Sequence, residues 1–153
     1  MYKKVLVPLD GSELAECALS HVKNLVKDGA ADEIIILNVF NPYFPMFEEK
    51  DFSTYGDMTA TRKKMRNDSI KYLADVESRL RSEGIKVKTE MLMGSRPAEV
   101  ISDYVRNNDI SLMVISTHGY TGLKKLMFGS VALEILHNSH APVLLIRPES
   151  CRS

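Results

Sequence analysis

Residues 112–131 read LMVISTHGYTGLKKLMFGSV: an apolar run, then a loop with two glycines, then Gly129-Ser130. The apolar run predicts a strand, and the amphipathic pattern of residues 131–136 predicts a helix that begins near Gly129-Ser130. Glycines let a backbone approach an anion closely, and the N–H groups of a helix's first turn point at it. The stretch therefore predicts a phosphate cradle, and a nucleotide polyphosphate is the expected anion. In the alternative interpretation the glycines serve turns and Ser130 caps the helix.

The same alternation runs along the whole chain. Apolar runs predict five strands, at residues 5–9, 33–39, 87–92, 112–115 and 143–146. Helical spacing predicts four helices between them, at residues 13–27, 59–82, 96–107 and 129–138. The helix over 59–82 is highly charged, with an inner stripe of Ile70, Leu73, Val76, Glu77 and Leu80. Nearly continuous apolar strands alternating with helices indicate a doubly wound α/β domain with a five-stranded parallel sheet and helices on both faces. A mixed α+β domain is the alternative.

Composition is typical of one globular domain. The chain has 153 residues, 44% of them hydrophobic, and 20 basic residues balance 20 acidic ones, so no global field recruits nucleic acid or an anionic membrane. We expect one domain over residues 1–148 and a flexible tail over 149–153. The start of the chain lacks the apolar length of a signal peptide, and no run approaches the roughly 20 residues of a membrane span. Cys17 and Cys151 lack CxxC spacing and are expected to be free thiols rather than a disulfide. Together these features predict a cytoplasmic protein.

The segment from Phe40 to Tyr55 breaks the pattern. It holds more than half of the chain's aromatic residues, and Pro42 and Pro45 lie among them. The prolines argue against regular structure, and the segment is longer than a usual connection in an α/β fold. Its role stays open between a loop that covers the sheet edge, a lid over a bound base and a surface for a partner.

The first strand ends in VPLDGS, residues 7–12. Ligands of open parallel sheets bind outside the carboxyl ends of the strands. Asp10 is therefore a candidate to bind a ribose, or a metal ion attached to a phosphate. Asp10 or Ser12 also suits the cap of the following helix, and a cap does not exclude contact with a ligand.

Catalytic signatures are missing from the sequence. The loop after residue 115 is neither a P-loop nor a GxGxxG dinucleotide motif. His118 lies in that loop, but we identify no nucleophile with an orienting acid to make a triad with it. The other histidines show no metal-ligand spacing. We therefore predict no catalytic residue.

Three blocks of sequence together resemble the universal stress protein family, over the chain from Tyr2 to Pro148. The segment VLVPLDGSE (5–13) matches the family's N-terminal signature, and GSRPAEVI (94–101) resembles its Gly-x-Pro-Ala-Glu pattern with one extra residue. The ATP-binding pattern of the family is Gly-x2-Gly-x9-Gly-Ser/Thr. Its last two elements match at Gly119 and Gly129-Ser130, but Ser116 stands at the first glycine. Serine there is tolerated unless the position needs a positive φ, in which case the pocket is altered.

The resemblance implies a flavodoxin-like sandwich with strand order 3-2-1-4-5, which brings Asp10 beside the 116–130 loop. It also implies bound ATP, or AMP or ADP, with Mg or Mn as a possible companion. Asp10 would contact the ribose, the backbone of Val39 the adenine, and Gly119, Gly129, Ser130 and Val131 the phosphates. The predicted nucleotide-binding residues are Pro8, Leu9, Asp10, Val39, Met93, Gly94, Ser116, His118, Gly119, Gly129, Ser130 and Val131.

We therefore expect an ATP-binding regulatory protein of the stress response, a nucleotide-dependent switch with slow or no hydrolysis. The resemblance adds a homodimer formed through the last strand, Pro142 to Arg147, an apolar edge that gains from being paired. No nucleic acid or membrane partner is expected. Two alternatives remain open: a nucleotide-free dimeric adapter, and a weak metal-dependent ATPase that uses Asp10. A response-regulator receiver is excluded, because only Asp10 lies at the matching strand ends.

Overall fold

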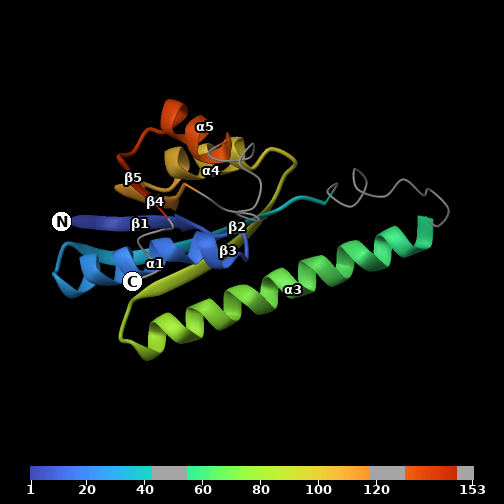
Figure 1. Ribbon diagram of the computed structural model, residues 1–153, viewed down its shortest axis with the longest axis horizontal. Helices are drawn as coiled ribbons and strands as arrows, with labels where there is room; N and C mark the ends of the chain where they lie inside the picture. The colour runs from blue at the N-terminus through green and yellow to red at the C-terminus, as the bar shows by residue number, and fades with distance from the viewer. Residues whose placement is uncertain (43–54, 118–129, 148–153) are drawn as a thin grey trace.

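The structure is a computed structural model of the chain, and it describes residues 1–42, 55–117 and 130–147. Its sheet has five parallel strands in the order β3-β2-β1-β4-β5 (Figure 1). The strands are β1 (Tyr2–Pro8), β2 (Ala31–Phe40), β3 (Val87–Met93), β4 (Leu112–Ser116) and β5 (Val143–Ile146). The helices are α1 (Glu13–Lys27), α3 (Tyr55–Ser82), α4 (Pro97–Asn107) and α5 (Ser130–Asn138). The predicted fold class and strand order are confirmed.

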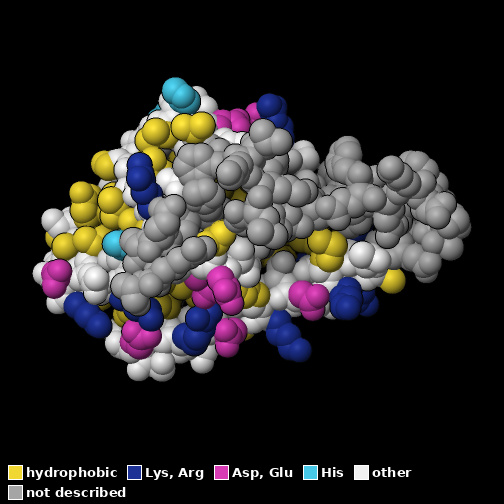
Figure 2. Space-filling model, in the orientation of Figure 1, with side chains coloured by type: hydrophobic (Ala, Val, Ile, Leu, Met, Phe, Trp, Pro, Cys, Tyr) yellow, Lys and Arg dark blue, Asp and Glu magenta, His cyan; other side chains and the backbone are white. Residues whose placement is uncertain are grey.

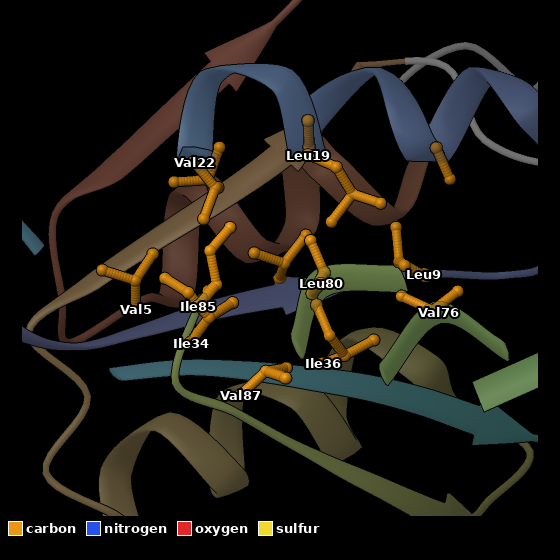
Figure 3. Packing of buried hydrophobic residues seen from close by; sticks show 14 of the residues in the cluster. Val5, Leu9, Leu19, Val22, Ile34, Ile36, Val76, Leu80, Ile85 and Val87 are labelled. Atoms are coloured by element: carbon orange, nitrogen blue, oxygen red, sulfur yellow. The ribbon is translucent and has the colours of Figure 1, made fainter. Parts of the chain in front are cut away.

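Helices cover both faces of the sheet, α1 and α3 on one and α4 and α5 on the other (Figure 1). Successive residues of β2 point to opposite layers: Ile34 and Ile36 pack under α1 and α3, whereas Ile35 and Leu37 pack under α4 and α5. Figure 3 shows the first of these layers, where side chains of α1 and α3 meet those of β1, β2 and β3. Burial on both faces explains why the inner strands β2 and β4 read as nearly continuous apolar runs.

The long helix α3 packs on the sheet with only its C-terminal half (Figure 1). Leu73, Val76 and Leu80 are buried, as the predicted stripe required. Ile70 is 46% exposed, so its assignment to the stripe is wrong. At Ile70 the helix extends beyond the carboxyl ends of the strands (Figure 1), where less apolar surface is available to cover the Ile70 side chain.

Cys17 lies on the buried side of α1 and is disulfide-bonded, so the prediction of a free thiol is wrong at this position. Cys151 lies outside the described residues. Free thiols therefore no longer support the expectation of a cytoplasmic protein. Among the helices of the described segments, none is both long and apolar enough to cross a membrane.

The order of the strands creates a switch point at β1. The chain passes from β1 to β2 on one side and reaches β4 on the other side of β1. At such a point the connections leave the carboxyl ends of the strands in opposite directions, which opens a crevice. The candidate site lies there.

Candidate functional site

A cavity of about 250 Å³ lies at the carboxyl ends of β1, β2 and β4, below the first turns of α4 and α5. Seven of the predicted nucleotide-binding residues line it: Pro8, Leu9, Asp10, Val39, Ser116, Ser130 and Val131. They come from four separate parts of the chain, so the fold brings the two main predicted blocks into one cavity.

Of the other five predicted residues, the structure describes two, and neither lines the cavity. Met93, which is 63% exposed, and Gly94 lie at the end of β3, on the far side of β2. His118, Gly119 and Gly129 lie outside the described residues.

Seven lining residues were missed: Ala15, Leu37, Pro97, Ile101, Ile115, Thr117 and Ala132. Most are apolar and read in the sequence as ordinary core positions. A signal was available for two of them. Leu37 is two residues before Val39 and therefore on the same face of β2, and Ile101 follows Pro97 by about one turn of α4.

Hydrogen bonds hold Asp10 in place at the mouth of the cavity. Its Oδ1 accepts from the backbone N–H of Ser12 at 2.9 Å and from the Ser12 hydroxyl at 2.6 Å. The Ser12 oxygen in turn accepts from the N–H of Ala15 at 3.1 Å and caps α1. Gly11, between them, has a φ of 91°, which suits glycine. Ser12 is thus the cap, and Asp10 is fixed through the cap at the place where a ligand can meet it.

Ser116, at the position of the first motif glycine, is an ordinary strand residue. It is the last residue of β4, is paired with Ile146 of β5 and is 6% exposed. Among the described residues other than glycine, only Asp109 has a positive φ. The backbone at Ser116 therefore does not require glycine, and the strain considered for a serine here is absent.

The start of α5 supplies hydrogen-bond donors to the cavity. Ser130 and Val131 occupy its first positions and line the cavity, and the N–H groups of a first helical turn have no partner within the helix. Asp10 is the one charged side chain among the described lining residues. An anion held here would bind to neutral donors and to the positive end of the helix dipole.

The rest of the cavity is apolar. Leu37, Val39, Ile101, Ile115 and Ala132 form walls that suit a flat, uncharged ring. An apolar slot between a carboxylate and a helix N-terminus fits a molecule with a ring at one end and an anion at the other.

A divalent metal fits this site only together with an anion. Within the described part of the chain, no three histidine, cysteine, aspartate or glutamate residues are grouped to hold a metal. Asp10 alone offers a carboxylate to the cavity, whereas Mg²⁺ is usually bound by one or two carboxylates plus phosphate oxygens. Asp10 would hold the ion, and the ion would neutralise phosphate charge.

Comparison with known proteins agrees with this arrangement. The sequence model of the universal stress protein family matches residues 1–147. The chain belongs to the universal stress protein family. A universal stress protein of Methanocaldococcus jannaschii is 30% identical over 148 residues, covering 96% of this chain and 83% of that protein.

Solved structures of the family share the fold. A second protein of M. jannaschii superposes with a TM-score of 0.80 at 31% identity, and the match covers 96% of each chain. A universal stress protein in complex with cAMP has a TM-score of 0.65 at 17% identity, covering 96% of this chain and 98% of the other. A family member from Arabidopsis thaliana with AMP bound has a TM-score of 0.66 at 16% identity, and the match covers 95% of this chain and 91% of the other. At these last identities the likeness concerns the fold alone.

Proposed function

We propose that this universal stress protein binds an adenine nucleotide, ATP in the first instance, in the cavity between β1 and β4. One observation carries the proposal: an apolar slot, the fixed carboxylate of Asp10 and the N-terminus of α5 line the same cavity. The AMP and cAMP bound by two proteins of this fold support it.

Each part of a nucleotide has a matching surface in this proposal. The adenine base lies between the apolar walls of the cavity and forms hydrogen bonds with the backbone of Val39. The ribose hydroxyls donate to Asp10. The phosphates face Ser130 and Val131 at the start of α5, where backbone N–H groups and the dipole favour negative charge.

The proposed role is regulatory, a switch in the stress response with slow or no hydrolysis. Asp10 is the only acidic lining residue in the described part, and its Oδ1 already accepts two hydrogen bonds from Ser12. A general base must reach the attacking water, and this carboxylate is committed to the cap and the ribose. Such a switch requires that the nucleotide bind one conformation of the protein more tightly than another, because a ligand shifts an equilibrium only by its difference in affinity for the two states.

The direct test is acid extraction of freshly purified protein and identification of the released nucleotide, followed by calorimetric titration with ATP, ADP and AMP. Ala132→Leu places three more carbons in the slot and should weaken binding at least about tenfold. Ala74→Leu makes the same change on an exposed position of α3 and should leave binding unchanged. A protein that carries no nucleotide, and whose melting temperature ATP does not change, is the nucleotide-free adapter instead.

Hydrolysis needs a separate assay. We expect single-turnover reactions with Mg²⁺ or Mn²⁺ to release no more phosphate than buffer does. Release that Asp10→Asn abolishes would establish the metal-dependent ATPase.

A homodimer through β5 is part of the proposal. β5 is an edge strand, with Leu144 and Leu145 38% and 36% exposed. Leu133 and Leu136 of α5 are 51% and 45% exposed, and Figure 2 shows hydrophobic side chains gathered over this end of the molecule. Antiparallel pairing of two β5 strands about a twofold axis would cover the open edge and these leucines together.

A further inference from the structure

Asn38 is a buried polar residue in the last part of β2, 6% exposed. Its side-chain Nδ2 donates to the carbonyl oxygen of Leu9 at 2.9 Å. Its Oδ1 is buried and accepts no hydrogen bond from any group in the described part of the chain. Asparagine is unfavourable in strands, and a buried acceptor without a donor costs stability. An apolar residue would suit the fold better, so the bond to Leu9 needs an explanation.

The hydrogen bond from Asn38 to Leu9 takes the place of the next backbone hydrogen bond between β1 and β2. The β1–β2 ladder ends where Pro8 pairs with Leu37, and one further bond joins Leu9 N–H to Leu37 C=O at 2.9 Å. In a continued parallel ladder, the Leu9 carbonyl would accept from the N–H of Val39. The amide of Asn38 occupies that carbonyl instead. Val39 has the same ladder orientation as Leu37, so its N–H points to the β1 side, where the cavity lies.

The same bond also fixes Asp10. The Leu9 carbonyl belongs to the peptide unit that joins Leu9 to Asp10, so holding this oxygen sets the direction in which Asp10 leaves the sheet. Beyond that peptide, Ser12 holds the Asp10 carboxylate. Asp10 is therefore anchored on both sides, by Asn38 from β2 and by Ser12 from the cap of α1.

We propose that Asn38 is a positioning residue of the nucleotide site: its amide holds the Leu9 carbonyl, which sets Asp10 for the ribose and leaves the Val39 N–H for the edge of the base. Asn38 itself is not a lining residue and acts through these neighbours. The inference rests on the proposed function for its ligand, but its geometry can be tested without one.

The first experiment measures amide hydrogen exchange in the nucleotide-free protein. In the native chain the Val39 amide should exchange fast and the Leu9 amide slowly. In Asn38→Leu, the freed Leu9 carbonyl should accept from Val39, and exchange at Val39 should slow at least about tenfold. Ile34→Val, a fully buried position of the same strand, is the control and should leave the Val39 rate in its native range. A Val39 amide that is already protected in the native chain, or that Asn38→Leu does not slow, overturns the proposal.

The second experiment measures ribose recognition. Calorimetry gives the dissociation constants of ATP and of 2′,3′-dideoxy-ATP for the native chain, Asn38→Leu, Asn38→Asp and Ile34→Val. The native chain should prefer ATP by roughly tenfold or more, the value of hydrogen bonds to a carboxylate. In both Asn38 variants this ratio should fall toward one, and Ile34→Val should retain it. A variant of Asn38 that binds more weakly but keeps the native ratio would show a general loss of stability and overturn the proposal.

The outcomes separate the two proposals. If the native chain binds neither nucleotide, the proposed function fails, and amide exchange alone decides the role of Asn38. Two Asn38 variants are included because Asn38→Asp keeps the side chain's shape but replaces the amide donor to Leu9 by a carboxylate, which only accepts hydrogen bonds and adds a negative charge, whereas Asn38→Leu removes the donor without adding a charge.

Discussion

Gly94 and Val100 approach so closely that no side chain fits between them. A Cβ atom placed on Gly94 lies 2.5 Å from Cγ2 of Val100, in the first turn of α4. The N–H of Gly94 donates to the carbonyl of Phe40 at 3.0 Å, which ties the turn to the end of β2. The absence of a side chain at Gly94 therefore allows the start of α4 to pack closely against the end of β3, which places Pro97 and Ile101 at the cavity.

Gly94→Ala should lower the free energy of unfolding by about 1–3 kcal/mol, because the stiff valine cannot move aside without strain. In a Val100→Ala background the same change should be neutral or slightly stabilising, since alanine reduces the entropy of the unfolded chain. Urea unfolding of the four proteins measures both effects. An equal cost in both backgrounds would contradict the contact as the cause.

Ser116→Gly tests whether the serine in the glycine motif weakens the site. Because the backbone at Ser116 is an extended strand end, restoring glycine should not improve ATP affinity beyond about twofold. It should cost about 0.5–1 kcal/mol of stability, as glycine does in a strand. Titration and urea unfolding provide the two numbers. A gain of tenfold or more in affinity would show that serine obstructs the ligand.

Leu145→Lys tests the proposed dimer. The substitution puts a charge on the open edge of β5. Because a twofold dimer contains the substituted residue once in each subunit, the interface receives two charges, and we expect a loss of about 3–6 kcal/mol in dimer stability. Sedimentation equilibrium should then show a monomer. Met93→Lys, on the opposite edge of the sheet and 63% exposed, is the matched control and should stay dimeric. If the Leu145→Lys variant is still a dimer, the dimer forms through a surface other than β5.

All five strands could be predicted from the sequence, most clearly β2 and β4, which are buried on both faces and read as apolar runs. The order of the strands was predicted from the family resemblance. The helix at Glu13 was placed correctly because the signal is local: Ser12 caps it in the structure as its residue type suggests. Ile70 was misplaced because periodicity shows which face of a helix is apolar but not where the sheet beneath it ends.

The site was predictable where a residue type carries chemistry, and less so where it is only packed. Asp10 and Ser130 carry polar groups and were found, whereas Leu37 and Ile115 line the cavity with side chains that any core would use. Asn38 was missed although it was visible as a polar residue inside an apolar strand. Its role depends on the carbonyl of Leu9, 29 positions away in sequence, and only strand order reveals that neighbour.

Tyr72 should make the protein sensitive to alkaline pH. Burial raises the pKa of its phenol well above the ordinary value, and the nearby Glu16 carboxylate, which Arg79 holds at 2.8 Å, raises it further. The folded state thus favours the neutral phenol. This stability is fully present below pH about 10, where the unfolded phenol ionises, and is lost as pH rises above it.

Tyr72→Phe removes this titration. Near neutral pH its effect should be small, about 0.5 kcal/mol either way, because the Tyr72 hydroxyl makes no hydrogen bond within the described residues. Above pH 10 the variant should lose stability less steeply than the native chain, by up to about 1.4 kcal/mol per pH unit. Tyr104→Phe is the parallel variant, because burial followed by Glu90 raises the pKa of Tyr104 in the same direction. Urea unfolding at several pH values measures these slopes, and an unchanged slope in Tyr72→Phe would show that Tyr72 does not control the alkaline transition.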